Sequence, residues 1–152
     1  MTTLDPTAIP LIERTAILAH KVGQLLLARV EEGLEELGLS SRSYFVLSAV
    51  DCETPRSQQE MSQLLTIDPT AIGVVVDDLE ARGLVKRARN RHDRRRYDLT
   101  LSEAGTSALA AAHEALATAE REFFEPLSGK QRAELHGLLQ RLIAGRWPPP
   151  HE

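Results

Sequence analysis

The chain has 152 residues, of which 42% are hydrophobic and 26% are charged, and its formal net charge is −4. These values are typical of an ordinary soluble globular domain with a real core. No apolar stretch approaches the roughly 18–20 residues that cross a bilayer, and the N-terminus lacks the basic and apolar regions of a signal peptide, so we expect a cytoplasmic protein with no membrane partner.

The chain contains a single cysteine, Cys52, which excludes an intramolecular disulfide and a cysteine-based zinc site. It also lacks a glycine-rich phosphate loop and the HExxH and GxSxG patterns of hydrolytic enzymes. The sequence therefore predicts no enzyme, no metal and no cofactor.

The first predicted helix spans residues 8–37 and is apolar on more than one face. Its apolar positions recur at helical steps of three and four residues: Ile9, Ile12, Ala16, Ala19, Val22, Leu26, Val30, Leu34 and Leu37. Leu18 and Leu25 add apolar surface on other faces. Such a helix needs more than one packing neighbour, and in a chain of this size we expect the second neighbour to be another subunit.

Local capping signals then predict two further helices. Ser40 or Ser41 can cap a second helix, which must stop before Pro55. Ser57 and Glu60 have the spacing of a capping box and open a short third helix.

A tight turn at residues 66–67 leads into a fourth helix, for which Asp68 supplies the N-cap oxygen and Pro69 occupies the first position. One face of this helix is apolar and is predicted to meet the core: Ile72, Val75, Val76 and Leu79. The opposite face carries Thr70, Gly73, Val74 and Asp77.

Residues 84–101 predict a β-hairpin with an extended basic tip, because residues 96–101 alternate polar with apolar side chains. From Lys86 to Arg96 the net charge is +6, whereas the rest of the chain carries −10. A positive hairpin on an acidic chain suggests a surface that binds phosphate, although a charge run by itself is often only a solvated loop.

Two helices complete the chain, one capped by Ser102 and running to about Glu125, the other opened by a capping box at Ser128 and Gln131. Two short helices, a tight turn and a hairpin, in that order, form a winged helix-turn-helix. The predicted fold class is mainly α with a small β-hairpin wing, and the predicted function is DNA binding.

Three stretches resemble the MarR family of bacterial transcription regulators. Residues 79–87 (LEARGLVKR) match the family pattern LExxGLVxR, residues 93–95 (DRR) its wing pattern DxR, and residues 101–105 (LSEAG) its L(T/S)xxG. The spacing fits without a gap, and helix order and length agree over essentially the whole chain. Two positions depart: Val74 stands where relatives often have Arg, and Thr66 where the turn often has Gly.

The resemblance implies a homodimer on a pseudo-palindromic DNA operator. Residues 1–37 and 103–147 would form the helical dimerisation region, and residues 38–102 the DNA-binding lobe. The recognition helices would enter successive major grooves, and Arg95 of each wing would enter a minor groove, held in place by Asp93.

The face of the fourth helix predicted to meet DNA has no lysine or arginine. Thr70 can hydrogen-bond a base edge or phosphate, and Ala71 and Val74 can pack on thymine methyl groups. Gly73 costs about 1 kcal/mol in mid-helix, which either a close approach of DNA or tight helix packing would explain. Asp77 is expected to orient an arginine, Arg95 or a neighbour. The predicted DNA-binding residues are Ser57, Gln58, Asp68, Pro69, Thr70, Ala71, Gly73, Val74, Arg87, Arg89, Arg91, Arg94, Arg95 and Arg96.

Members of the family usually bind an effector between the dimer helices and the DNA lobe. In that region this sequence places Arg14, His20, Tyr44 and His113 among apolar residues. An arginine fork binds a carboxylate and His or Tyr binds a phenol, which suits a small aromatic acid such as a hydroxybenzoate that releases a repressor from DNA.

Alternatively, Arg14 pairs with an acidic side chain and His20 is an interface histidine. Arg14 and His20 lie on different stripes of the helix, so they share a pocket only if its walls wrap that helix or both subunits contribute.

Two other functions stay open at this point. Some relatives sense peroxide through one cysteine, but Cys52 follows Asp51 and precedes Glu53, and neighbouring carboxylates disfavour the reactive thiolate. A winged helix can also act as a scaffold that binds protein instead of DNA, which the acidic body of the chain would suit.

Overall fold

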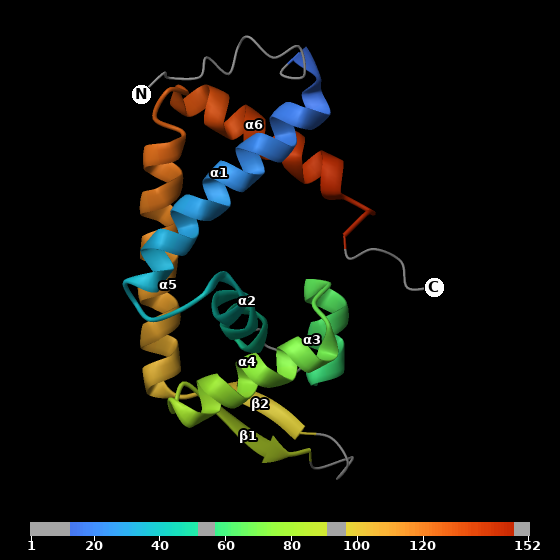
Figure 1. Cartoon of the computed structure of the whole chain (residues 1–152), viewed down its shortest axis with the longest axis vertical. Coiled ribbons are helices and arrows are strands. Elements are labelled where there is room, and N and C mark those ends of the chain that lie inside the picture. Colours follow the sequence, from blue (N-terminus) through green and yellow to red (C-terminus); the bar gives the residue numbers. More distant parts are fainter. Residues whose placement is uncertain (1–12, 52–56, 91–96, 148–152) are drawn as a thin grey trace, which may run out of the picture.

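The structure is a computed structural model that describes residues 13–51, 57–90 and 97–147. The described residues form helices α1 (Thr15–Glu35), α2 (Ser41–Val50), α3 (Gln58–Leu65), α4 (Pro69–Ala81), α5 (Glu103–Phe123) and α6 (Gly129–Ile143), and strands β1 (Val85–Arg89) and β2 (Tyr97–Leu101). Figure 1 shows α2, α3, α4 and the hairpin gathered at one end of the molecule and α6 at the other, with α5 running along one side between the two ends and α1 leading from α6 toward α2. The predicted fold class is confirmed.

The first helix is shorter than predicted: residues 13 and 14, within the predicted span, precede α1, and the helix also ends early, while residues 8–12 lie outside the described residues. It ends at Glu35, and the next three residues turn the chain toward α2. Gly38 has φ +66°, and the Leu39 N–H donates to the Leu34 carbonyl at 2.9 Å. This left-handed glycine closes the helix end and makes the predicted end at residue 37 two residues late.

The predicted caps of α2, α3 and α4 are confirmed. Ser40 accepts a hydrogen bond from the Ser43 N–H, Ser57 and Glu60 form a complete capping box, and Asp68 accepts from the Thr70 N–H at 2.8 Å. Thr66 lies between α3 and α4 and has φ 54°. Among the described residues, it is the one non-glycine residue with a left-handed backbone conformation. A β-branched residue in that region is strained.

The hairpin is antiparallel, and its register pairs Val85 with Leu101 and Arg89 with Tyr97. Val85 and Leu99 are 1% and 2% exposed, so one face of the hairpin closes the core beneath α4. The core also contains these buried side chains from the helices: Leu34, Val46, Leu47, Met61, Ile72, Val76, Leu79, Leu109 and Ala112. It therefore continues into the ends of α1 and α5, across the expected division of the chain at residues 37 and 102.

The start of α5 is hydrogen-bonded to the short segment between α4 and β1. The Ser102 N–H donates to the Leu84 carbonyl at 3.1 Å, and the Ser102 hydroxyl donates to the Gly83 carbonyl at 2.6 Å. A Cβ on Gly105 would lie 1.9 Å from the Leu84 oxygen. Only glycine permits this approach, which explains the small residue in the LSEAG stretch. Helix α5 ends at Phe123, two residues before the predicted end.

Helices α1 and α6 leave large apolar side chains exposed. Leu18, Val22, Leu25 and Leu27 of α1 are 42–60% exposed, and four residues of α6 are 48–58% exposed: Leu138, Leu139, Leu142 and Ile143. In Figure 1, α6 crosses α1 at the end of the molecule away from the hairpin, and α6 has no buried residue. No helix in the described part of the chain is long and apolar enough to span a membrane.

Candidate nucleic-acid interface

The N-terminus of α3 is held by its capping box. The Glu60 carboxylate accepts from the Ser57 N–H at 2.7 Å and from the Ser57 hydroxyl at 2.9 Å, and the Ser57 oxygen accepts from the Glu60 N–H at 3.2 Å. The Ser57 side chain is thus engaged within its own helix. Gln58, the other residue at the start of α3 that was predicted to contact DNA, takes no part in the cap.

The start of α4 is organised in the same way. Asp68 caps the helix through the N–H groups of Thr70 and Ala71, and Pro69 lies at its first position. Both residues were predicted to contact DNA, but their roles in starting α4 already account for Asp68 and Pro69 at these positions. Beyond this cap, Thr70 and Asp77 are exposed and Val74 is 65% exposed, whereas Ile72 on the opposite face is fully buried.

Gly73 lies in the middle of this exposed face. No heavy atom lies within 4 Å of the position that a Cβ on Gly73 would occupy, outside its own helix. Tight packing within the chain, one of the two explanations considered for this glycine, therefore does not apply.

Arg87 of β1 connects the hairpin to α4. Its guanidinium donates to the Asp77 carboxylate and lies 3.3 Å from the Glu80 carboxylate, and its side chain is 26% exposed. Asp77 thus binds an arginine, which is Arg87 of β1; Arg95, the arginine named first for this role, lies outside the described residues. The second partner, Glu80, was missed, although its spacing of three residues from Asp77 puts both on one helix face.

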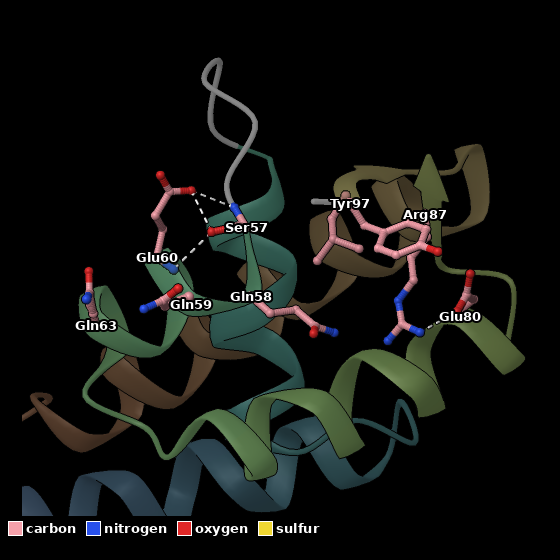
Figure 2. A pocket seen from close by; sticks show the side chains of 9 residues that line it. Ser57, Gln58, Gln59, Glu60, Gln63, Glu80, Arg87 and Tyr97 are labelled. Atoms are coloured by element: carbon pink, nitrogen blue, oxygen red, sulfur yellow. Dashed lines mark hydrogen bonds and ion pairs between the residues drawn. The ribbon is translucent and has the colours of Figure 1, made fainter. Parts of the chain in front are cut away.

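A polar hollow of about 920 Å³ separates α3 from the hairpin. Figure 2 shows Gln58 extending from α3 into this hollow, with Arg87 and Tyr97 on its other side. Tyr97 is 47% exposed and was not predicted as a site residue. An aromatic residue next to a basic tip is a signal that could have found it.

The base of the wing is tied together by an amide. Asn90 donates to the two carboxylate oxygens of Asp98 at 2.8 and 3.1 Å. Lys86 and Arg89 are exposed on β1. The predicted tip residues lie outside the described residues: Arg91, Asp93, Arg94, Arg95 and Arg96.

The four residues predicted to bind an effector are not brought together within one chain. Tyr44 of α2 and His113 of α5 make an edge-to-face contact, with ring centroids 5.6 Å apart. Arg14 is the N-cap of α1, at the end of that helix away from α2, and the 21 residues of α1 span about 30 Å. His20 is exposed one to two turns into α1. A pocket that holds all four would require a second subunit.

A capped helix-turn-helix with an exposed α4 face and a basic hairpin beside it define a winged helix-turn-helix protein. The family model described as MarR family matches residues 37–96. A putative transcriptional regulatory protein for the hcr operon of Thauera aromatica is 33% identical over 105 residues, which are 69% of this chain and 63% of that protein. The aligned part is thus less than two thirds of the Thauera protein.

Two solved structures have the same fold over nearly their full length. CouR from Rhodococcus jostii RHA1, bound to p-coumaroyl-CoA, is 28% identical with a TM-score of 0.75, covering 95% of this chain and 100% of that one. A mutant of MarR from Escherichia coli, complexed with operator DNA, is 24% identical with a TM-score of 0.74, covering 93% and 99%. The chain belongs to the MarR family of transcriptional regulators.

Proposed function

We propose that this protein is a transcriptional repressor that binds a pseudo-palindromic DNA operator as a homodimer and leaves it when a small aromatic acid binds. The observation that carries the DNA-binding part is the basic hairpin beside the exposed face of α4. Seven of the chain's 18 lysines and arginines lie between residues 86 and 96, although the whole chain is acidic. Phosphate contacts of this kind supply most of the affinity of DNA-binding proteins.

Each lobe would divide its contacts between the two grooves. Helix α4 would lie in the major groove with its Thr70–Asp77 face toward the bases. Lys86, Arg89 and the tip arginines would contact phosphates, and Arg95, oriented by Asp93, would enter the minor groove. Arg87 would contribute less to phosphate binding than its charge suggests, because Asp77 and Glu80 already neutralise it.

The second subunit would cover the apolar side chains that α1 and α6 expose. Eight large apolar side chains on these two helices are 42–60% exposed in the single chain. Contiguous exposed apolar surface of this kind marks association sites. A dimer formed through this region would present two lobes to the two halves of an operator.

The effector site would lie near the contact between Tyr44 and His113, where α2 of the lobe meets α5. A phenol or carboxylate could hydrogen-bond both side chains, and Arg14 and His20 would come from the other subunit. CouR, of the same fold, binds p-coumaroyl-CoA, a ligand with a phenolic acyl group. A ligand at this position would change how the lobe sits against the dimer helices.

Fluorescence anisotropy on labelled DNA from upstream of the gene, with and without a panel of hydroxybenzoates, tests this proposal. We expect tight binding that weakens on the order of a thousandfold between roughly 50 and 200 mM salt, and release by one aromatic acid. Binding that no acid relieves would remove the effector class and leave the DNA-binding function. The absence of binding to any genomic fragment would favour the scaffold function instead.

A matched pair of arginine variants tests the role of the wing. Arg95→Ala should lower the affinity and reduce the salt slope by about 1 for each lobe. Arg29→Ala removes the same charge from α1, where Arg29 pairs with Glu32, and should leave both quantities unchanged. Equal behaviour of the two variants would remove Arg95 from the interface.

A further inference from the structure

The exposed face of α4 is unusual for a surface that reads DNA bases. Gly73, Val74 and Asp77 lie three, four and seven residues after Thr70, so the four residues form one stripe. Neither this stripe nor the rest of α4 contains a lysine, arginine, asparagine or glutamine. The side chains that most often read guanine and adenine are therefore missing from the helix that would lie in the major groove.

The one charged group on the stripe is already occupied. A carboxylate could accept a hydrogen bond from the amino group of cytosine, but the Asp77 carboxylate is bound by Arg87 of the hairpin. Reading cytosine through Asp77 would require this ion pair to open. The stripe is thus left with the Thr70 hydroxyl and with apolar groups.

Val74 stands out among the exposed apolar side chains. At 65% it is the most exposed large apolar residue of the described chain, and it lies on the lobe rather than on α1 or α6, where most of the others lie. Dimerisation through α1 and α6 would not cover it. Gly73 beside it leaves the helix surface open, because a Cβ there would meet no heavy atom within 4 Å outside its own helix.

We propose that Val74 is a specificity-determining residue that reads the 5-methyl group of a thymine in each operator half-site, with Gly73 allowing the helix to approach the base pair. This inference rests on the proposed DNA-binding function. A valine side chain offers two methyl groups to the one chemical feature that distinguishes thymine by shape in the major groove. The contact is apolar and gains energy by excluding water, so it does not depend on salt as the phosphate contacts do.

The test begins with a duplex selected by the wild-type protein from a random pool. Each thymine is then replaced in turn by deoxyuridine, which removes only the methyl group. We expect one symmetry-related pair of thymines to matter, with affinity falling about fourfold for each half-site, the effect of one buried methyl group. At the same position, 5-methylcytosine should bind more tightly than cytosine.

Val74→Ala separates this readout from general DNA binding. In this variant the deoxyuridine effect at that thymine pair should shrink, because alanine offers less apolar surface to the methyl group, while the salt slope stays that of the wild type. Gly73→Ala should lower DNA affinity although it makes the free protein more stable, a combination that a purely structural glycine would not give.

The possible failures are distinct. Tight DNA binding with no thymine sensitive to deoxyuridine, or with a sensitivity that is as large in Val74→Ala as in the wild type, would overturn the inference and leave the proposed function standing. If the wild type selects no duplex at all, the proposed function fails and the inference falls with it.

Discussion

The lobe formed by α2, α3, α4 and the hairpin differs from the region formed by α1 and α6 in how complete it is within one chain. In the lobe, Val46, Met61, Ile72 and Val85 are at most 1% exposed, and each helix is closed by its own cap. Among the described residues, α6 buries none and α1 buries only Leu34. The lobe buries its core within one chain and exposes polar and basic side chains, while α1 and α6 expose an apolar surface that we propose a second subunit covers.

The largest expected effect concerns the exposed apolar surface of α1 and α6. Leu25→Glu should weaken dimerisation by about 4 kcal/mol, because two leucines per dimer each lose about 2 kcal/mol of burial. Sedimentation equilibrium should then show monomers at concentrations where the wild type is dimeric. Val74→Glu makes the same change on the lobe and should remain dimeric. If Leu25→Glu associates like the wild type, the dimer does not form through α1.

The next largest effect is expected where the start of α5 contacts the segment between α4 and β1. Gly105→Ala would place a Cβ 1.9 Å from the Leu84 oxygen, so either α5 or the segment between α4 and β1 must move. We expect a loss of about 3 kcal/mol in unfolding free energy, as for an overpacked core, measured by urea unfolding. Gly73→Ala, where the space is open, should instead gain up to about 1 kcal/mol. Wild-type stability of Gly105→Ala would mean that this junction is not rigid.

Within the lobe, the turn between α3 and α4 stores a smaller strain. Thr66 has φ 54°, a conformation that costs a non-glycine residue about 1–2 kcal/mol. Thr66→Gly should therefore raise the unfolding free energy by about 1 kcal/mol in the same urea experiment, since part of the gain is lost to chain entropy. Thr70→Gly, inside α4, should lower it by a similar amount. A destabilised Thr66→Gly protein would show that the threonine side chain is needed at the turn.

The smallest expected effect concerns the link between hairpin and helix. Arg87→Lys keeps the charge but loses the planar fork that reaches Asp77 and Glu80. Because these groups are partly exposed, the loss should stay under about 1 kcal/mol. Arg89→Lys on the same strand serves as the control and should unfold like the wild type. A larger loss for Arg87→Lys would show that the ion pairs hold the lobe together as well as positioning the wing.

The secondary structure could be predicted because its signals are local. The capping boxes at Ser57 and Ser128 and the Asp68-Pro69 pair each act within one helical turn. These signals gave the order of the elements and most of their boundaries to within two residues.

Contacts between elements were harder to predict. The two acids that bind Arg87 depend on how the hairpin packs against α4, and the link from Asn90 to Asp98 depends on the register of β1 against β2. Figure 1 likewise shows which end of α1 lies next to α2, and Arg14 caps the opposite end of that helix. Helical spacing shows which residues share a face, but it does not show which face of another element lies opposite.

The most direct test of the central claim is the stoichiometry of the complex with DNA. The selected duplex, held well above its dissociation constant, would be titrated with protein while fluorescence anisotropy is recorded. Our account predicts a break at two chains per duplex for the wild type, and weak binding with no sharp break for Leu25→Glu. A break at one chain per duplex, or equal binding by Leu25→Glu, would contradict a repressor that reads its operator with two lobes.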